Sequence, residues 1–185
     1  MDIEELRRRA KAGEELEYVF FWGPTHDDHG RMTEHCLSQW YPSPFEVDGI
    51  RYATAEHWMM AEKARLFGDA GTLERILADP SPAKAQKLGR TVRCFDAGRW
   101  NAHRSEIVVR GNVHKFKQFA PMGEYLRSTR PHVLVEASPL DRIWGIGLDR
   151  SAPEARDPRT WRGLNLLGFA LMEVRERVFG AVRTA

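Results

Sequence analysis

The segment Thr54–Phe67, TAEHWMMAEKARLF, restricts the fold more than any other part of the sequence. At 3.6 residues per turn it predicts an amphipathic helix that gathers Met59, Met60 and Phe67 on one side. Thr54 is a residue type that caps a first helical turn. Such an apolar stripe must be covered by other elements, so the segment predicts a packed helical core.

Two charged residues, Glu56 and Lys63, interrupt this stripe. They lie about 20° apart around the helix and about 10.5 Å apart along it, which is too far for a direct ion pair within one helix. In the structural interpretation, each charge finds its own partner on another element, and periodicity alone favours this. In the functional interpretation, the stripe faces a pocket where carboxylate and amine converge on a ligand. Glu62 and Arg65 lie on the opposite, surface-facing side.

Composition limits the class of protein. A chain of 185 residues predicts a single domain, and 28 Lys and Arg against 26 Asp and Glu give a net charge of +2, too even for a general nucleic-acid binder. Cys36 and Cys94 stand alone, which argues against a disulfide scaffold or zinc site and for a reducing compartment. The charged N-terminus is neither signal peptide nor membrane anchor, and no apolar run approaches 18 residues, so we expect a cytoplasmic protein.

The rest of the pattern predicts an α+β fold, mainly helical, with a few short strands. Helices are expected at 2–17, 71–77, 83–90, 103–119, 123–129 and 165–179. Strands are expected at 18–23 and 132–138, with a hairpin at 45–54 that turns at Asp48-Gly49. We predict an N-terminal helical extension over residues 1–17 and a single domain over residues 18–185.

The segment EASPLDRIWGIG, residues 136–147, has the composition of a ligand-binding loop that follows a strand. A strand ends at Glu136, and Asp141, Trp144 and Gly145 follow. A Trp beside Gly-x-Gly is suited to stack on a flat ligand while backbone N–H groups meet phosphate oxygens. A turn anchored by a buried Trp explains the segment equally well.

Three weaker patterns are also present. Basic residues surround Trp100 and could bind phosphate, although a solvated surface is equally favoured; they are Lys84, Lys87, Arg90, Arg93 and Arg99. Metal-ligating residue types gather early in the chain without ligand spacing, so we predict no metal there; they are His26, Asp27, Asp28, His29 and His35. Asn165 is placed to cap the last helix, and Gly168 within it predicts close backbone packing.

Taken together, these segments resemble the NADAR family, also called YbiA-like. The blocks that carry the resemblance are FFWG (20–23), TAEHWMMAEK (54–63), DPSPAKAQKLGR (79–90), Trp100, HKF (114–116), LVEAS (134–138), DRIWGIG (141–147) and GLNLLGFALMEVR (163–175). They occur in order over residues 18–178. One departure lies before the hairpin, in EHCLSQWYPSPF, where members often have a Ser-Asn or Ser-like position; Ser38 matches it only loosely and is given no role.

The resemblance implies an α+β fold and an N-glycosidase that hydrolyses a ribose–base bond without a metal or redox cofactor. Two substrate classes are associated with the family: ADP-ribosyl adducts, notably on guanine in nucleosides or DNA, and phosphorylated ribosylamino-pyrimidine intermediates of riboflavin synthesis. A small nucleotide-like substrate, or an ADP-ribosylated nucleic acid, is therefore the expected partner, and no membrane is expected.

The resemblance also assigns roles to residues. Cleavage builds positive charge on the ribose and electron density on the base; Glu56 or Asp141 would stabilise the cation or activate water. Lys63 would hold a phosphate or neutralise Glu56, or would attack ribose C1 as an amine to form a Schiff base. The expected substrate-binding residues are Trp22, Gly23, His57, Met60, Arg90, Trp100, Glu136, Trp144, Gly145 and Asn165. The alternatives are a non-catalytic ADP-ribose-binding module and, ranked third, a metal-dependent hydrolase centred on His26–His35.

Overall fold

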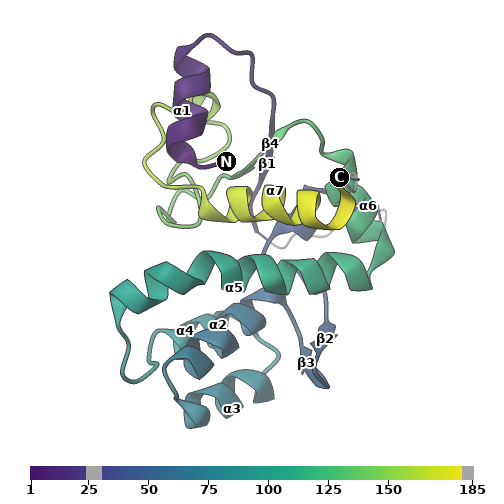
Figure 1. Ribbon diagram of the computed structural model, residues 1–185, viewed down its shortest axis with the longest axis vertical. Helices are drawn as coiled ribbons and strands as arrows, with labels where there is room; N and C mark the ends of the chain where they lie inside the picture. The colour runs from purple at the N-terminus through teal and green to yellow at the C-terminus, as the bar shows by residue number, and fades with distance from the viewer. Residues whose placement is uncertain (24–30, 181–185) are drawn as a thin grey trace, which may run out of the picture. The chain divides into compact units, whose positions relative to one another are not determined.

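The computed structural model describes residues 1–23 and 31–180. Over these residues the chain forms seven α-helices, two short 3-10 helices and four short strands, in agreement with the predicted α+β, mainly helical fold (Figure 1). It divides into two compact units: unit 1 comprises Met1–Ser38 and Pro121–Ala185, and unit 2 comprises Gln39–Ala120. Within the described ranges, no helix is long and apolar enough to cross a membrane.

Unit 1 is built from both ends of the chain. Its elements are α1 (Ile3–Lys11), β1 (Tyr18–Phe21), η1 (Glu34–Leu37), most of α6 (Ala120–Ser128), β4 (Val133–Glu136), η2 (Pro153–Arg156) and α7 (Leu166–Phe179). β1 and β4 pair in parallel, with Tyr18 opposite Val133 and Phe21 opposite Glu136. β4 packs against α7 (Figure 1). The first three residues of β4 are buried, as expected for a parallel strand covered by other elements.

The N-terminal helix is shorter than the predicted span of residues 2–17. α1 begins at the cap Asp2, whose side chain accepts a hydrogen bond from Glu5 N, and it ends at Lys11. Gly13 follows in the left-handed region with a φ of 80°. A glycine of this kind ends a helix at little conformational cost, which explains the early stop.

Unit 2 is a continuous segment organised around one helix. Its elements are β2 (Phe45–Val47), β3 (Ile50–Tyr52), α2 (Ala55–Leu66), α3 (Ala70–Ala78), α4 (Pro82–Gly89) and α5 (Ala97–Gln118). The predicted hairpin is confirmed: β2 and β3 are antiparallel, and Asp48 and Gly49 have φ values of 51° and 75° at the turn. α2 packs against α3, α4 and α5 (Figure 1).

The prediction that α2 is amphipathic is wrong. Thr54 does cap it, accepting a hydrogen bond from His57 N, but every residue from Ala55 to Ala61 is buried. A helix with neighbours on several sides has no solvent face over that length, so an apolar stripe does not describe it. Only its last turns reach the surface, where Glu62 and Arg65 form an ion pair.

α5 starts six residues before the predicted span, because the Asp96 side chain accepts a hydrogen bond from Arg99 N at 2.6 Å and caps the helix. Gly111 lies inside this helix for a packing reason. A Cβ at Gly111 would lie 2.2 Å from the Trp58 ring, whose indole N–H donates to Ile107 O at 2.8 Å. α2 and α5 therefore approach closely at this point.

Candidate functional site

The two units divide the predicted site residues between them, and each group has its own local environment. Unit 2 holds Glu56, His57, Met60, Lys63, Arg90 and Trp100; unit 1 holds Trp22, Gly23, Glu136, Asp141, Trp144, Gly145 and Asn165.

Lys63 is the centre of the group in unit 2. Its Nζ donates a hydrogen bond to the carbonyl oxygen of Gly89 at 2.8 Å. The same atom lies 4.3 Å from the centroid of the Phe95 ring and 5.4 Å from that of Trp100. We call Lys63, Glu56, Gly89, Phe95 and Trp100 the lysine cluster.

The environment changes the acidity of this amine. Burial lowers the pKa of Lys63 below its ordinary value, and the positive charge of Arg90 lowers it further, while the carboxylate of Glu56 opposes both. A lowered pKa raises the fraction of neutral amine, which is the nucleophilic form, at neutral pH. Burial and Arg90 thus act toward the neutral amine, whereas the Gly89 carbonyl and the two ring contacts act toward the charged form.

Glu56 lies in the first turn of α2 and is 2% exposed. Its backbone N–H donates to the carbonyl of Gln39 at 3.0 Å. The helix thus carries a buried acid at its start and a half-buried amine two turns later, close enough for the carboxylate to influence the amine's charge.

The end of the DPSPAKAQKLGR block, residues 79–90, explains how the lysine cluster is assembled. A Cβ at Gly89 would lie 1.9 Å from the sulfur of Met60, so only glycine lets the end of α4 pack this closely against α2. This approach brings the Gly89 carbonyl to Lys63. Met60 is buried beneath it at 7% exposure, so its thioether serves this packing.

His57 belongs to the support of α2. It is 1% exposed, and both ring nitrogens are engaged: Nδ1 lies 2.8 Å from Thr54 Oγ1, and Nε2 lies 2.8 Å from the carbonyl of Asp79. Burial lowers the pKa of His57, which favours a neutral ring that donates through Nε2 and accepts at Nδ1. This ring fixes the start of α2 to the end of α3.

The basic residues around Trp100 do not form one uniform group. Lys84 pairs with Asp79 at 2.8 Å, and the Arg93 guanidinium pairs with Asp69 at 3.0 Å. Arg90 is exposed and donates to the side-chain oxygen of Gln86 at 3.1 Å. Arg90 is therefore the member whose charge both reaches the lysine cluster and faces solvent.

In unit 1, Asp141 organises the loop that carries Trp144. Its Oδ1 accepts hydrogen bonds from the backbone N–H groups of Ile143 and Trp144 at 2.7 and 2.8 Å. The backbone N–H of Asp141 donates a hydrogen bond to the hydroxyl oxygen of Ser138 at 3.2 Å. These bonds give the Asp141 carboxylate a structural task within its own turn and leave Trp144 partly exposed.

Asn165 occupies the predicted cap position of α7, but its side chain makes other bonds. With a φ of 52°, it donates to Leu134 O at 2.9 Å and accepts from Glu136 N at 3.0 Å. It thereby continues the hydrogen bonding of β4. The predicted close packing at Gly168 is confirmed, because a Cβ there would lie 2.1 Å from Leu134 O. Gly145 is equally confined, with Glu136 O only 2.8 Å from such a Cβ.

Trp22 and Gly23 follow β1. The Trp22 side chain is 47% exposed, and Gly23 has a φ of 73°. The carbonyl of Gly23 lies 3.3 Å from His35 Nδ1. The predicted His and Asp group from His26 to His29 lies outside the described residues; in the described ranges, no three His, Cys, Asp or Glu residues gather as metal ligands.

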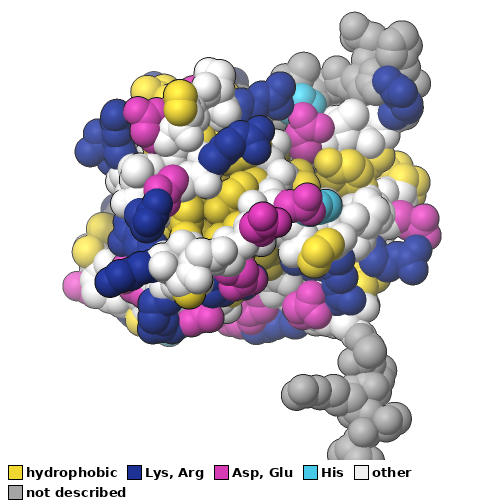
Figure 2. Space-filling model, turned by 90° about the horizontal axis from the view of Figure 1, so that it is seen from above, with side chains coloured by type: hydrophobic (Ala, Val, Ile, Leu, Met, Phe, Trp, Pro, Cys, Tyr) yellow, Lys and Arg dark blue, Asp and Glu magenta, His cyan; other side chains and the backbone are white. Residues whose placement is uncertain are grey.

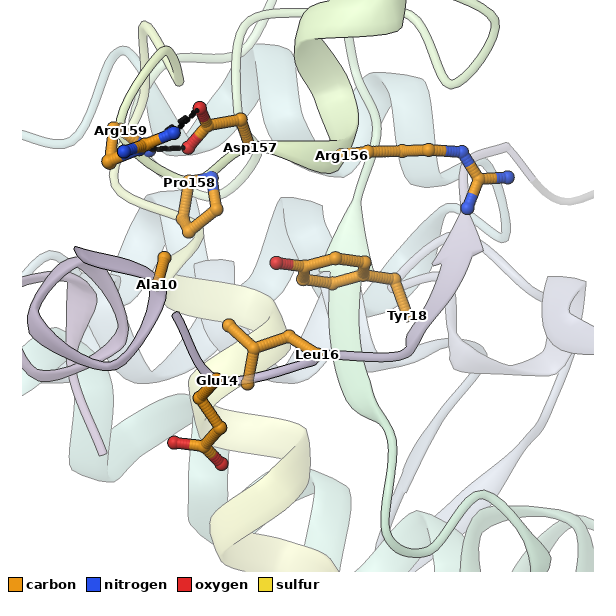
Figure 3. A pocket seen from close by; sticks show the side chains of 8 residues that line it. All are labelled: Ala10, Glu14, Leu16, Tyr18, Arg156, Asp157, Pro158 and Arg159. Atoms are coloured by element: carbon orange, nitrogen blue, oxygen red, sulfur yellow. Dashed lines mark hydrogen bonds and ion pairs between the residues drawn. The ribbon is translucent and has the colours of Figure 1, made fainter. Parts of the chain in front are cut away.

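A cavity of about 240 Å³ in unit 1 lies between the segment around α1 and residues 156–159 (Figure 3). Its charged groups are already engaged: Asp157 pairs with Arg159 at 2.7 Å, Glu14 with Arg9 at 2.7 Å, and the Arg156 guanidinium lies over the Phe20 ring. Small-molecule pockets are usually larger, roughly 300–1,000 Å³. We therefore assign this cavity to the packing of the N-terminal segment.

Basic and acidic side chains are interspersed over the face seen in Figure 2. This mixture agrees with the net charge of +2. A surface that binds long nucleic acid carries a basic patch or stripe, and this face shows none.

Sequence reasoning did not identify Phe95 or Asp69. Phe95 is a 47% exposed aromatic residue in the segment between α4 and α5. Nothing local indicates that this segment returns to Lys63. Asp69 offered one signal, since an Asp directly before a helix is a typical cap.

Comparison with known proteins identifies the family. The family model described as the NADAR domain matches residues 20–179. N-glycosidase R617 of Acanthamoeba polyphaga mimivirus is 40% identical over 164 residues, which cover 86% of this chain and 95% of that protein. N-glycosidase YbiA of Escherichia coli strain K12 is 30% identical over 154 residues, covering 83% and 84%. The NMR structure of E. coli YbiA aligns with a TM-score of 0.68 and 27% identity, covering 89% of this chain and 86% of that one. The chain therefore belongs to the NADAR family.

Proposed function

We propose that this protein is an N-glycosidase that hydrolyses the bond between a ribose and a base. Relatives named N-glycosidases, in the mimivirus, in E. coli and in Nostoc punctiforme, support a hydrolase of N-glycosyl compounds. The observation that carries the proposal is the lysine cluster: an amine with a lowered pKa, held by one carbonyl and two aromatic rings on a helix that also carries a buried carboxylate.

Lys63 acts as the nucleophile in this proposal. Its neutral amine attacks ribose C1, and the bond from C1 to the base breaks with its electron pair going to the base, which takes up a proton. Loss of the amine proton and opening of the sugar ring give a Schiff base, and water then restores the free amine and releases the ribose. The hydrogen bond to Gly89 O fixes one N–H and so limits the directions in which the lone pair can point.

Glu56 supplies the carboxylate that stabilises the positive ribose or activates water. It is the better of the two candidates because Asp141 Oδ1 is committed to two backbone N–H groups of its own loop. Asp141 is therefore assigned to hold the loop of Trp144 within unit 1. Arg90, exposed beside the lysine cluster, is suited to bind a phosphate.

The preferred substrate is ADP-ribosylated guanine, as a nucleoside or within DNA. Phosphorylated ribosylamino-pyrimidines offer the same ribose, base and phosphate groups, and are the second class to test. Among the described residues, Cys36 is buried, Cys94 is exposed and neither forms a disulfide. Together with the low cysteine count, this supports the proposal of a reducing, cytoplasmic compartment.

The deciding experiment incubates the protein separately with ADP-ribosylated guanosine and with a ribosylamino-pyrimidine phosphate, and measures released base by chromatography. Release from the first substrate supports the preferred assignment, and release from the second alone changes it. No release from either, together with measurable binding, would establish the competing function of a non-catalytic ADP-ribose-binding module.

A second experiment tests the role of Lys63. Borohydride reduces a Schiff base, so adding it during turnover should leave a stable ribosyl adduct on the peptide that contains Lys63, detectable by mass spectrometry. Base release should also rise with pH as Lys63 loses its proton. A protein that releases base, forms no adduct and loses activity as the pH rises would instead use Lys63 as a positively charged anchor.

A further inference from the structure

The segment between α4 and α5, residues 90–96, lies against Lys63; we call it the cover segment. Phe95 is its point of contact, with the ring centroid 4.3 Å from Lys63 Nζ. The same ring packs at 5.3 Å against Phe67, which follows α2, and yet is 47% exposed. An exposed aromatic ring thus lies against the amine, in a segment that is neither strand nor helix.

The cover segment is fastened by the carboxylate of Asp69, which is 2% exposed. Asp69 Oδ2 accepts a hydrogen bond from the backbone N–H of Arg93 at 3.0 Å, and Oδ1 accepts one from the Arg93 guanidinium at 3.0 Å. Thr72 donates to both oxygens, through its N–H and its hydroxyl. These four bonds tie the residue two positions before Phe95 to the start of α3.

The backbone between these two contacts is unusual. Cys94, which lies between Arg93 and Phe95, has a φ of 54°, in the left-handed region that a cysteine rarely adopts. Such a conformation persists only where the surroundings hold it. Asp69 on one side and the packing of Phe95 on the other provide that constraint.

We propose that Asp69 is a positioning residue for Lys63: through Arg93 it holds the cover segment closed, so that Phe95 shields the amine from water. An amine shielded in this way is neutral more often than an exposed lysine, and its direction is fixed by Gly89 O. A catalytic role for this shielding rests on the proposed function, because only an amine that reacts has to be kept neutral. The geometry itself does not depend on the substrate.

The test measures the titration of Lys63 directly. The full-length protein is labelled briefly with acetic anhydride across a pH series, and mass spectrometry gives the labelling rate of each lysine. In the native protein, the midpoint for Lys63 should lie below the ordinary lysine value of about 10.4. Asp69→Asn and Phe95→Leu should both move it back toward that value, because each lets water reach the amine. Phe95→Tyr, which keeps the ring, should leave it in place.

Asp69→Asn is a suitable variant because asparagine still caps α3 but cannot accept from both Arg93 groups as a carboxylate does. Asp157→Asn, which removes the pair with Arg159 in unit 1, is the matched control and should leave the Lys63 midpoint unchanged. If Asp69→Asn does not fold, the exposed residue Phe95 still provides the test through its Leu and Tyr variants.

An unchanged midpoint in folded Phe95→Leu would overturn the proposal. Labelling needs no substrate, so this result is separate from the base-release assay. A shifted midpoint without any base release would support the shield and reject the glycosidase.

Discussion

The lysine cluster of unit 2 and the Trp144 loop of unit 1 hold their polar groups in opposite ways. In the Trp144 loop, the side chains of Asp141 and Asn165 form hydrogen bonds with backbone N–H and C=O groups of their own unit. Glycines stand where the backbones approach most closely. In the lysine cluster, by contrast, one backbone carbonyl and two aromatic rings contact the amine of the Lys63 side chain.

This difference separates residues that hold the structure of unit 1 together from residues that can react. A carboxylate that accepts hydrogen bonds from several backbone groups mainly stabilises the fold. A half-buried amine with a lowered pKa destabilises the fold but is more reactive. Each prediction below tests one side of that contrast.

The largest effect is expected for Lys63→Met. Removing the nucleophile should lower base release by on the order of 10³-fold or more. Stability should be unchanged or slightly higher, because a half-buried charge is replaced by an apolar chain of similar length. Base-release kinetics and urea unfolding measure the two effects. Lys84→Met, at an exposed ion pair, is the control and should affect neither by much.

Gly168→Ala tests the packing of α7 against β4 in unit 1. Its Cβ would lie 2.1 Å from Leu134 O, so β4 and α7 must separate. We expect a loss of about 3 kcal/mol or more in the free energy of unfolding. The control is Gly71→Ala in α3, where a Cβ would have open space and helix propensity should add about 0.5–1 kcal/mol. Equal effects at the two glycines would contradict the packing described for unit 1.

The two carboxylates should differ in kinetics. Glu56→Gln should reduce the maximal rate of base release by about 10²-fold or more, since it removes the reacting charge. Asp141→Asn keeps an oxygen for the two N–H groups and should reduce the rate by less than about tenfold. Binding of the substrate to Glu56→Gln, measured by calorimetry, should be retained. A larger rate loss in Asp141→Asn would exchange the two roles.

The smallest effect concerns the link between Asp69 and the pH dependence of stability. Hydrogen bonds from Arg93 and then Thr72 hold the pKa of Asp69 far below its usual range. A depressed pKa stabilises the folded state above the unfolded value of about 4, and that stabilisation is lost as the pH falls below it. The difference in urea midpoint between the native protein and Asp69→Asn should therefore be constant from pH 5 to pH 7 and shrink toward pH 2. A difference that does not change over this range would contradict the assignment.

Local signals in the sequence were sufficient for much of the fold. Thr54 predicted the start of α2, and Asp48-Gly49 predicted the turn of the hairpin, because caps and tight turns depend on a few adjacent residues. The charges at Glu56 and Lys63 were noticed for a related reason, since they conflict with the apolar residues around them. The family resemblance, confirmed by the match over residues 20–179, supplied the interpretation that periodicity could not.

Contacts between distant segments were not predictable in the same way. α2 is buried on several sides because α3, α4 and α5 pack against it. These contacts join segments that are distant in the sequence, so no local sequence pattern predicts them. Phe95 reaches Lys63 across an intervening stretch that includes two helices, and its exposed ring looks like any loop aromatic until that contact is seen. The catalytic and binding roles assigned to individual residues stay predictions until the variants are measured.

The parallel pairing of Tyr18 with Val133 has a consequence for biosynthesis. Unit 2 is one uninterrupted stretch of chain, so a ribosome delivers everything it needs before β4 has been made. β1 emerges first but must wait for its partner strand until all of unit 2 has been translated. We therefore expect the nascent protein to fold from the middle outward, with the central unit organised while the N-terminal strand is still unpaired.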